Sequence, residues 1–376
     1  MRNPFYFRTL PIDAAFCDRE KELEELISHA NNRANVTLIS PRRYGKTSLV
    51  RRVQHALSNQ GSATLYADFF GVTSGEEVAA KLASEVYRIT HKQESLYDKA
   101  IRFFSLLRPV VRPDQESGYS ITVEISKGKT GIELIEDAMT GLGKFAAGKN
   151  ALCHIVFDEF QEIVELKDAY AIEGVMRSHI QNHSNASYFF VGSRRRILSD
   201  MFNDRKRPFY KSAVNYHLSP LPMDDLISFL IERFKSQGKS CSREISQKIY
   251  DLTMGYPYYA QKLAYHTFEL TDTQAADKEL HGAFLRLIEE EKPLFEAIIQ
   301  GLGIRQISLL TALAKEPTQT PFAVDYMTRH NLGSVGAVQG AVKKLERLDY
   351  IERIDAVYRV VDPILAVWLK KREVIE

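Results

Sequence analysis

The chain has no long apolar run and hardly any net charge. None of its apolar stretches approaches the ~20 residues that a bilayer-spanning helix needs, and its N-terminus lacks the apolar core of a secretory leader. With 50 basic and 48 acidic residues the formal net charge is +2, so the chain as a whole is not drawn to nucleic acid or anionic lipid. We therefore expect neither membrane insertion nor secretion, and any nucleic-acid contact must come from a local patch.

Cysteine is scarce as well. The three cysteines, Cys17, Cys153 and Cys241, are odd in number, and their spacing matches no metal-binding motif. We expect reduced thiols in a cytoplasmic protein rather than a disulfide framework. The 376 residues are enough for two or three domains, and the apolar and charged fractions are those of a globular protein.

The run from Ser40 to Thr47 carries the most specific chemistry. It has the sequence SPRRYGKT, follows an apolar strand-like segment at 36–39 and precedes a helical pattern at 48–53. A strand, a loop ending in Gly-Lys-Thr and a helix form the usual setting of a phosphate-binding loop, in which backbone N–H groups and the helix N-terminus bind phosphate oxygens. The predicted nucleotide-binding residues here are Pro41, Arg42, Arg43, Tyr44, Gly45, Lys46, Thr47 and Ser48.

Two side chains of this loop have expected roles in phosphoryl transfer. Lys46 is expected to contact the β- and γ-phosphates, and the Thr47 hydroxyl to hold Mg²⁺. The loop departs from the common pattern at Ser40, where the first glycine usually stands. Since glycine adopts backbone conformations that serine adopts less readily, we expect the chain to enter the loop in another way.

An acidic pair follows later in the chain. Asp158 and Glu159 come directly after the apolar run 152–157. In a parallel sheet this position is the C-terminal edge, and we expect both carboxylates beside the phosphate loop of the neighbouring strand. We predict that Asp158 binds the Mg²⁺ shell and that Glu159 is the general base for the attacking water. The alternative for Glu159 is a solvated loop carboxylate.

A polar residue, Ser193, ends the next strand-like run at 188–193. Ser193 is predicted to contact the γ-phosphate or the water, and a plain turn or helix cap is the alternative. Two basic runs, 194–196 and 205–207, come soon after. An arginine that reaches the γ-phosphate would stabilise its developing charge, but basic runs are more often solvated, and the sequence singles out no arginine.

The order of the expected elements predicts an α/β fold, because strands that alternate with helices indicate a parallel sheet with crossover helices. From 223 to 316 the pattern is helical, interrupted at Gly255-Tyr256-Pro257. Two short strands, 350–354 and 357–361, then flank a tight turn, as in the wing of a winged helix. The other expected strands are 36–39, 63–68, 119–125, 152–157 and 188–193, and the expected helices of the first half are 19–31, 75–91, 95–107, 131–147 and 168–183.

Local signals set the expected boundaries of these elements. Residues 1–16 are expected to form an extended arm, and Asp18 to cap the first helix. The prolines of Arg108–Pro113 predict a break in the chain. The strand that follows this break is expected to belong to a hairpin.

Together these motifs resemble the archaeal and bacterial branch of the signal-transduction AAA+ ATPases, the STAND class. The resemblance covers most of the chain and implies a AAA+ P-loop core in 1–221, a helical lid in 222–300 and a winged-helix domain in 301–376. The segments that carry the resemblance are 16–20, 40–47, 157–161, 191–194, 207–210, 255–257 and 358–368.

The resemblance implies a slow ATPase that uses ATP or ADP with Mg²⁺ as a molecular switch, moving the lid and the winged helix. It places Ser193 at the sensor position, Gly255 and Pro257 beside the adenine, and Phe16 to Arg19 near the base. No residue matches an arginine finger, and the usual sensor repeats and fused effector domain are absent. The signal, the protein partner and a homo-oligomer formed on ATP binding therefore stay open.

The helix expected at 334–348 is the candidate recognition helix of the winged helix. Its N-terminal end offers only Gln339 for base contacts. Three basic residues further along can contact phosphates, which does not specify sequence. The basic residues are Lys343, Lys344 and Arg347, and the expected buried stripe consists of Val335, Val338, Val342 and Leu345.

Two glycines in this helix, Gly336 and Gly340, each cost roughly 1 kcal/mol in a helix interior. Close approach of the helix backbone to a neighbouring surface would explain them, so both packing against the ATPase core and non-specific DNA contact stay open. Two other functions are alternatives to the switch. One is a DNA-binding regulator with a mainly structural nucleotide, and the other is a small-molecule kinase, for which the sequence has no acceptor-pocket motif.

Overall fold

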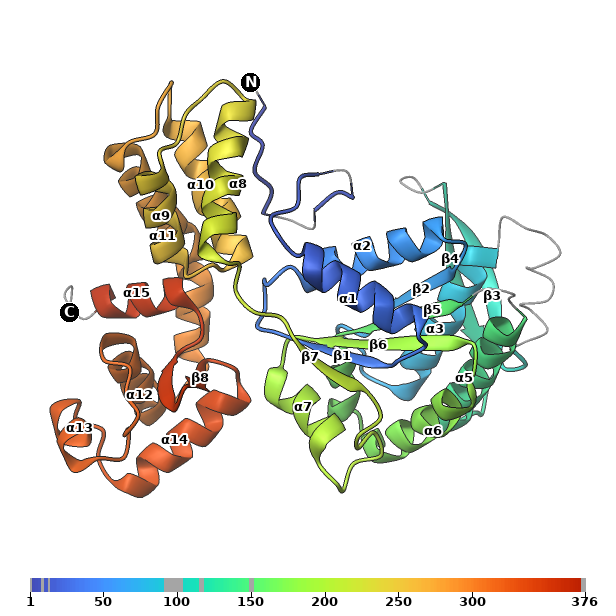
Figure 1. Cartoon of the computed structure of the whole chain (residues 1–376). Coiled ribbons are helices and arrows are strands. Elements are labelled where there is room, and N and C mark those ends of the chain that lie inside the picture. The colour runs from blue at the N-terminus through green and yellow to red at the C-terminus, as the bar shows by residue number, and fades with distance from the viewer. Residues whose placement is uncertain are drawn as a thin grey trace. The chain divides into compact units, whose positions relative to one another are not determined.

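The computed structural model describes residues 2–7, 10–12, 14–90, 104–114, 118–148 and 152–372. The chain divides into two compact units (Figure 1). We call Arg19–Ser40 with Lys46–Leu218 the sheet unit. We call Met1–Asp18, Pro41–Gly45 and Ser219–Glu376 the helical unit.

A five-stranded sheet with the order β2-β5-β6-β1-β7 forms the centre of the sheet unit. All its pairings are parallel, as predicted. The strand that carries the acidic pair, β5, is not the neighbour of β1, because β6 pairs with both. The expectation that the acidic pair follows the strand next to β1 is therefore wrong. A crossover helix can place the next strand of the chain at a position that is not adjacent to the first. The strands are β1 (Val36–Ile39), β2 (Ala63–Asp68), β5 (Cys153–Asp158), β6 (Ala186–Gly192) and β7 (Val214–His217).

Helices cover both faces of this sheet, with α1 and α2 on one face and α5, α6 and α7 on the other (Figure 1). Alternate strand residues, such as Ile155 and Phe157 of β5, enter a core that includes side chains of α3, α5, α6 and α7, as the two-residue period of a strand requires. The helices of this unit are α1 (Glu20–Asn31), α2 (Lys46–Asn59), α3 (Gly75–Thr90), α5 (Gly131–Ala147), the 3₁₀ helix η1 (Phe160–Glu165), α6 (Ala169–Asn182) and α7 (Arg195–Asn203).

The motif at 207–210 contributes to this core. The ring of Phe209 is fully buried and lies 5.4 Å from Phe160 and 5.3 Å from Phe190, measured between ring centroids. Phe160 and Phe190 are themselves 4.7 Å apart. Aromatic groups of this size dominate the energetics of a core, so this part of the motif holds the fold together.

The predicted cap of the first helix is wrong. The N-cap of α1 is Arg19, and no side chain caps the helix. Asp18 and Arg19 have left-handed backbones, with φ of 52° and 80°, whereas a side chain that caps a helix needs an extended backbone.

The predicted break at Arg108–Pro113 is also wrong, because these residues belong to β3 (Leu107–Asp114). This strand pairs antiparallel with β4 (Gly118–Ile125), which confirms the predicted hairpin. Proline is tolerated because each strand of a two-stranded sheet is an edge strand. Of the helix predicted at 95–107, residues 95–103 lie outside the described residues, and Leu107 begins β3.

The helical unit anchors the N-terminal arm. Phe5 is 3% exposed, and its ring centroid lies 5.3 Å from that of Phe234 and 6.2 Å from that of Phe268. The Asn3 amide donates to the Glu269 carboxylate at 2.6 Å. The arm is thus held against α8 and α10. The helices of this part are α8 (Met223–Ser236), α9 (Arg243–Thr253), α10 (Pro257–Leu270) and α11 (Asp277–Gln300).

The remainder of the helical unit has the predicted winged-helix elements. Strands β8 and β9 pair antiparallel around Asp355 and Ala356. Both turn residues have positive φ, 49° and 67°, as a two-residue hairpin turn requires. The elements are α12 (Ile304–Lys315), α13 (Val324–Arg329), α14 (Val335–Arg347), β8 (Ile351–Ile354), β9 (Val357–Val360) and α15 (Pro363–Arg372).

Helix α14 departs from prediction at one residue of its expected buried stripe. Val338, Val342 and Leu345 are buried as expected, but Val335 is 43% exposed because it lies in the first turn, directly after the Ser334 cap. A Cβ atom added at Gly336 or at Gly340 would have no atom within 4 Å. Close packing within the helical unit therefore does not explain the two glycines.

Two expectations from composition concern the whole chain. Among the residues that the structure describes, no helix combines the length and the apolar character needed to span a bilayer. Cys17, Cys153 and Cys241 are all described, and they are buried thiols outside any disulfide.

A buried histidine gives the fold a testable pH dependence. His154 on β5 is fully buried, and neither ring nitrogen has a hydrogen-bond partner among the described residues. Burial lowers the pKa of His154 from 6.5 to about 3. As pH falls below 6.5, the unfolded chain binds a proton that the folded chain does not bind. The free energy of unfolding should therefore fall by about 1.4 kcal/mol per pH unit from this residue.

Urea unfolding of wild type and of His154→Leu between neutral pH and about pH 4 checks this expectation. The variant should lose stability less steeply with acid, because it lacks the titrating ring. Parallel pH profiles for the two proteins would contradict it.

Candidate nucleotide-binding site

The predicted strand–loop–helix is present. The four residues of β1 are buried, and α2 begins at Lys46. The loop between them turns through left-handed backbone at Arg43 (φ 68°) and Gly45 (φ 81°). Glycine adopts this conformation at no cost, whereas for a residue with a side chain it costs roughly 1–2 kcal/mol. Alternation of this kind can direct successive N–H groups toward one anion.

Ser40 accepts hydrogen bonds from the loop lysine. Lys46 is 6% exposed, and its Nζ donates to the Ser40 carbonyl at 3.1 Å and to the Ser40 Oγ at 3.3 Å. Ser40 is not among the described residues with positive φ, so the loop entry does not need the backbone freedom of glycine. The serine hydroxyl instead supplies an acceptor that glycine lacks.

The two predicted metal ligands lie together. The Thr47 hydroxyl donates to Asp158 Oδ2 at 3.3 Å, and the Tyr66 hydroxyl donates to the same oxygen. Asp158 is 6% exposed, and burial raises its pKa. These are oxygen donors of the kind that Mg²⁺ prefers, and Mg²⁺ usually takes only one or two protein ligands beside phosphate and water. The residues therefore fit Mg²⁺, with Thr47 and Asp158 as the groups that would hold it.

Glu159 is held in place by two donors. The Ser193 hydroxyl donates to Glu159 Oε2 at 3.0 Å, and the Gln161 amide donates to the same oxygen. Ser193 is 3% exposed. Glu159 has a left-handed backbone (φ 50°) at the start of η1. The structure thus joins the predicted base to the predicted sensor residue, and a plain solvated carboxylate does not describe Glu159.

Sequence reasoning missed Tyr66 and Gln161. Tyr66 reaches Asp158 because β2 pairs with β5, in a register that places Asp68 opposite Asp158. Nothing in the sequence signals that pairing. Burial, together with the charge and hydrogen bond of Asp158, raises the pKa of Tyr66. Gln161 did have a signal, since it belongs to the run 157–161 that carries the family resemblance, but no role was assigned to it.

Two arginines of the basic runs, Arg194 and Arg207, form ion pairs within the sheet unit. Arg194 lies 2.9 Å from the Glu165 carboxylate and 3.5 Å from that of Glu162. Arg207 donates to Glu173, which is fully buried. These contacts favour structural roles for both residues.

The residues expected beside the adenine lie in the helical unit. Gly255 has φ 70°, and a Cβ there would lie 2.6 Å from the Leu221 carbonyl oxygen, so this turn requires glycine. Pro257 occupies the first turn of α10, where its missing N–H is not needed. Their contact with a base stays a prediction.

Of the other predicted residues of the phosphate loop, Pro41, Tyr44 and Ser48 are buried and Arg42 is exposed.

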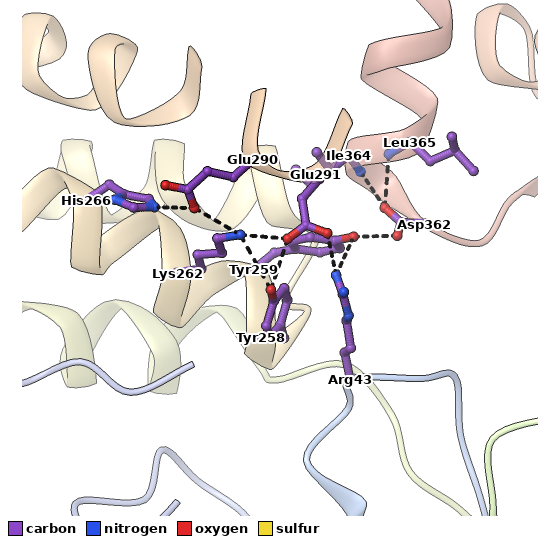
Figure 2. A network of polar contacts seen from close by, with 10 residues as sticks. All are labelled: Arg43, Tyr258, Tyr259, Lys262, His266, Glu290, Glu291, Asp362, Ile364 and Leu365. Atoms are coloured by element: carbon purple, nitrogen blue, oxygen red, sulfur yellow. Dashed lines mark hydrogen bonds and ion pairs between the residues drawn. The ribbon is translucent and has the colours of Figure 1, made fainter. Parts of the chain in front are cut away.

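The side chain of Arg43 belongs to a polar network in the helical unit (Figure 2). Its Nη1 donates to Glu291 Oε2 at 2.6 Å, and its guanidinium carbon lies 4.2 Å from the Tyr258 ring centroid. Lys262 donates to Glu291 Oε1 at 2.7 Å. Although burial opposes ionisation of Glu291, hydrogen bonds from Arg43 and Lys262 lower its pKa. Glu291 is therefore a charged, buried partner for Arg43.

The network continues to the last helix (Figure 2). The Arg43 guanidinium donates to the Tyr259 hydroxyl at 3.4 Å, and Tyr259 donates to Asp362 Oδ2 at 2.5 Å. Asp362 Oδ1 accepts from the backbone N–H groups of Ile364 and Leu365, at 2.9 and 3.0 Å. A continuous chain of hydrogen bonds thus links Arg43 to the start of α15.

Comparisons with known proteins agree with this organisation. A family model described as an ATPase domain predominantly from Archaea matches residues 16–263. A second model, described as a probable winged helix domain, matches residues 293–371. No curated protein matches the chain.

Solved structures resemble the chain over nearly its whole length. The Walker-type ATPase PABY2304 of Pyrococcus abyssi is 18% identical with a TM-score of 0.70, and the match covers 94% of this chain and 96% of that one. The ORC2 protein of Aeropyrum pernix, solved as ADPNP–ADP complexes, is 15% identical with a TM-score of 0.59 and 98% coverage of both chains. The ORC1 protein of Aeropyrum pernix, solved with DNA, is 13% identical with a TM-score of 0.53, covering 100% of this chain and 97% of that one. Similarity at this level of identity establishes a shared fold.

Proposed function

Because the chain belongs to the family of ATPase domains found predominantly in Archaea and carries a winged helix domain after it, we propose that it binds and slowly hydrolyses ATP and uses the nucleotide state as a switch. One observation carries this proposal. The Thr47 hydroxyl lies 3.3 Å from Asp158 Oδ2, at the C-terminal end of β5. Glu159, the next residue, accepts a hydrogen bond from Ser193. A metal-holding pair and a fixed carboxylate base are the groups that ATP hydrolysis needs.

Each of these residues has a defined part in the proposed reaction. Lys46 and the loop N–H groups bind the β- and γ-phosphates, and Thr47 with Asp158 would hold Mg²⁺. When bound, that ion would neutralise charge on the phosphate oxygens. Glu159 accepts a proton from the attacking water as the water oxygen bonds to the γ-phosphorus and the bond to ADP breaks. Ser193 keeps the Glu159 carboxylate directed toward that water.

The finer assignment is to the STAND class, with a core in 1–221, a lid in 222–300 and a winged helix in 301–376. We place Gly255 and Pro257 near the adenine of the bound nucleotide, whether this is ATP or ADP. We also place the protein in the cytoplasm, which suits its three buried thiols. A protein partner and assembly on ATP binding belong to the same proposal, since switches of this kind act on other proteins.

Calorimetric titration with a slowly hydrolysed ATP analogue, together with release of phosphate from ATP, tests the proposal on the full-length chain. Both are expected in the presence of Mg²⁺, and phosphate release is expected to stop when EDTA removes the metal. The nucleotide complexes of the Aeropyrum pernix ORC2 protein, which has the same fold, make ATP and ADP the first ligands to try. No binding of either nucleotide would overturn the proposal.

The network around Arg43 supports coupling between the nucleotide and the winged helix. Arg43 is part of the phosphate loop, and Asp362 precedes α15 within the winged-helix match. Tyr259 bridges the two side chains, at 3.4 and 2.5 Å. A change in the loop backbone on phosphate binding would move Arg43 and so change the hydrogen bond that Asp362 receives. Coupling between distant sites requires a network of side chains that can take two alternative arrangements.

Tyr259→Phe should break this coupling, because it removes the bridging hydroxyl and leaves the ring. In wild type, ATP should change hydrogen exchange at the Leu365 amide by several-fold, and in Tyr259→Phe that nucleotide-dependent change should disappear. Tyr326→Phe is the matched control, since the Tyr326 hydroxyl donates to the Glu316 carbonyl, outside the network. An equal response to ATP in all three proteins would contradict the coupling.

DNA binding is the second candidate function, favoured by the surface of α14. Lys343, Lys344 and Arg347 are exposed on this helix, and Gly336 and Gly340 leave its backbone open to close approach. The similar ORC1 protein of Aeropyrum pernix was solved with DNA. We propose phosphate contacts without base readout, because Gln339 is the one residue near the N-terminal end of the helix with a base-reading side chain.

Fluorescence titration of a labelled duplex measures this second function. With three phosphate contacts, affinity should fall roughly 40-fold between about 50 and 200 mM salt, and equally for unrelated sequences. Lys343→Ala should lower the slope of log affinity against log salt by about 0.9. Affinity that is independent of salt, or a strong preference for one sequence, would count against it.

A further inference from the structure

We infer that Gln161 is a positioning residue that holds Glu159 in the orientation for general-base catalysis, an inference that rests on the proposed ATPase activity. Gln161 lies in η1, two residues after Glu159, and is fully buried. Its Nε2 donates to Glu159 Oε2. No part of the mechanism above uses this side chain.

The chemistry of the amide group sets the direction of this contact. A carboxylate only accepts hydrogen bonds, so the amide must present its nitrogen to Glu159 and its oxygen away from it. The Gln161 Oε1 atom is then buried without a partner among the described residues. An unsatisfied buried acceptor costs roughly 1–3 kcal/mol. The unpartnered oxygen therefore lowers stability. What the glutamine provides in return is donation from Nε2 to Glu159, with a longer contact of 3.5 Å to Glu162 Oε1.

The next strand leaves space for this amide. A Cβ added at Gly192 would lie 2.0 Å from Gln161 Oε1, closer than any real contact. Gly192 ends β6, directly before Ser193. The Gly-Ser pair thus supports Glu159 in two ways, since the glycine makes room for one donor and the serine is the other.

The two donors leave one carboxylate oxygen for the reaction. Gln161 Nε2 and Ser193 Oγ both meet Oε2 of Glu159, and no hydrogen bond from a described residue reaches Oε1. Fixing one oxygen from two sides prevents rotation of the carboxylate and leaves the other to accept a proton from water. Holding a base in its reactive geometry contributes to the rate without contributing to substrate binding.

Gln161→Met tests the inference, because methionine has a similar length, cannot donate to Glu159 and removes the unpartnered oxygen. We expect kcat for ATP hydrolysis to fall by about 10- to 100-fold, KM for ATP to change by less than about twofold, and thermal stability to be equal or higher. A kcat that stays within twofold of wild type or rises, or a KM that rises in parallel, would overturn the inference.

Gly192→Ala provides a second route to the same displacement, since the new methyl group would push the amide aside. Its kcat should fall as in Gln161→Met. In a Glu159→Gln background, Gln161→Met should have no further effect on the residual rate, because the base that it positions is gone. Independent losses in the double variant would assign Gln161 a merely structural role.

These measurements separate the inference from the function on which it rests. If wild type hydrolyses ATP and Glu159→Gln does not, while Gln161→Met and Gly192→Ala match wild type, only the inference about Gln161 fails. If wild type neither binds nor hydrolyses ATP, the proposed function fails first.

Discussion

Lys46→Ala is expected to lose measurable ATP binding. Lys46 has a buried ammonium group whose Nζ lies 3.1 Å from the Ser40 carbonyl oxygen. Its proposed contact with the β- and γ-phosphates is a charge-assisted hydrogen bond. Each such hydrogen bond contributes about 1.5–3 kcal/mol, so loss of two should weaken binding by more than about 100-fold. Isothermal titration calorimetry with a slowly hydrolysed ATP analogue and Mg²⁺ measures this effect.

Lys21→Ala is the matched control for this variant. Lys21 lies on α1 with a side chain that is 85% exposed and belongs to no part of the proposed site. The Lys21→Ala variant should bind ATP with the affinity of wild type. Thermal unfolding of Lys46→Ala shows whether the fold persists, which matters because the substitution also removes the two hydrogen bonds from Lys46 to Ser40. ATP binding by a folded Lys46→Ala protein at wild-type affinity would remove the basis for the phosphate loop.

Glu159→Gln is expected to bind ATP normally and to hydrolyse it very slowly. Glutamine keeps the size of the side chain, and its carbonyl oxygen can still accept from Gln161 and Ser193, so the local geometry should persist. It cannot take a proton from water at neutral pH. General-base catalysis contributes typically 100- to 10,000-fold, and phosphate release should fall by about that factor, while the Kd for ATP stays within about twofold.

Glu165→Gln serves as the control for this variant. Glu165 ends η1, is 52% exposed and pairs with Arg194, so the loss of its charge should leave hydrolysis unchanged. Equal hydrolysis by wild type and Glu159→Gln would overturn the assignment of the base. In that case a residue other than the carboxylate beside Ser193 would have to activate the water.

The extent to which the sequence predicted the site depends on the range of each contact. The phosphate loop was predictable because its strand, turn and helix are consecutive in the chain, and the acidic pair because an apolar strand ends directly before it. The sequence did not predict Tyr66 as the partner of Asp158 or Gln161 as the partner of Glu159. Tyr66 reaches Asp158 only through the pairing of β2 with β5, and Gln161 needs the space above Gly192. Such contacts depend on strand order, which local periodicity does not encode.

The errors have the same origin. Arg108–Pro113 was predicted as a break because proline disrupts most regular structure, yet β3 tolerates it as an edge strand. Val335 fits the helical stripe of α14 but lies in the first turn and is exposed. In both cases the surroundings of the residue, and not its type, decided the outcome.

The sequence by itself determined the α/β class, the positions of the phosphate loop and acidic pair, and the change from a sheet to helices and a winged helix. Backbone periodicity and loop chemistry act between residues close in the chain, and so they can be inferred from the sequence alone. Only the tertiary structure decided that β6 lies between β1 and β5, that Ser193 and Gln161 meet the same oxygen of Glu159, and that Arg43 pairs with Glu291. These arrangements depend on which faces bury one another, a property of the packed chain that no single segment contains.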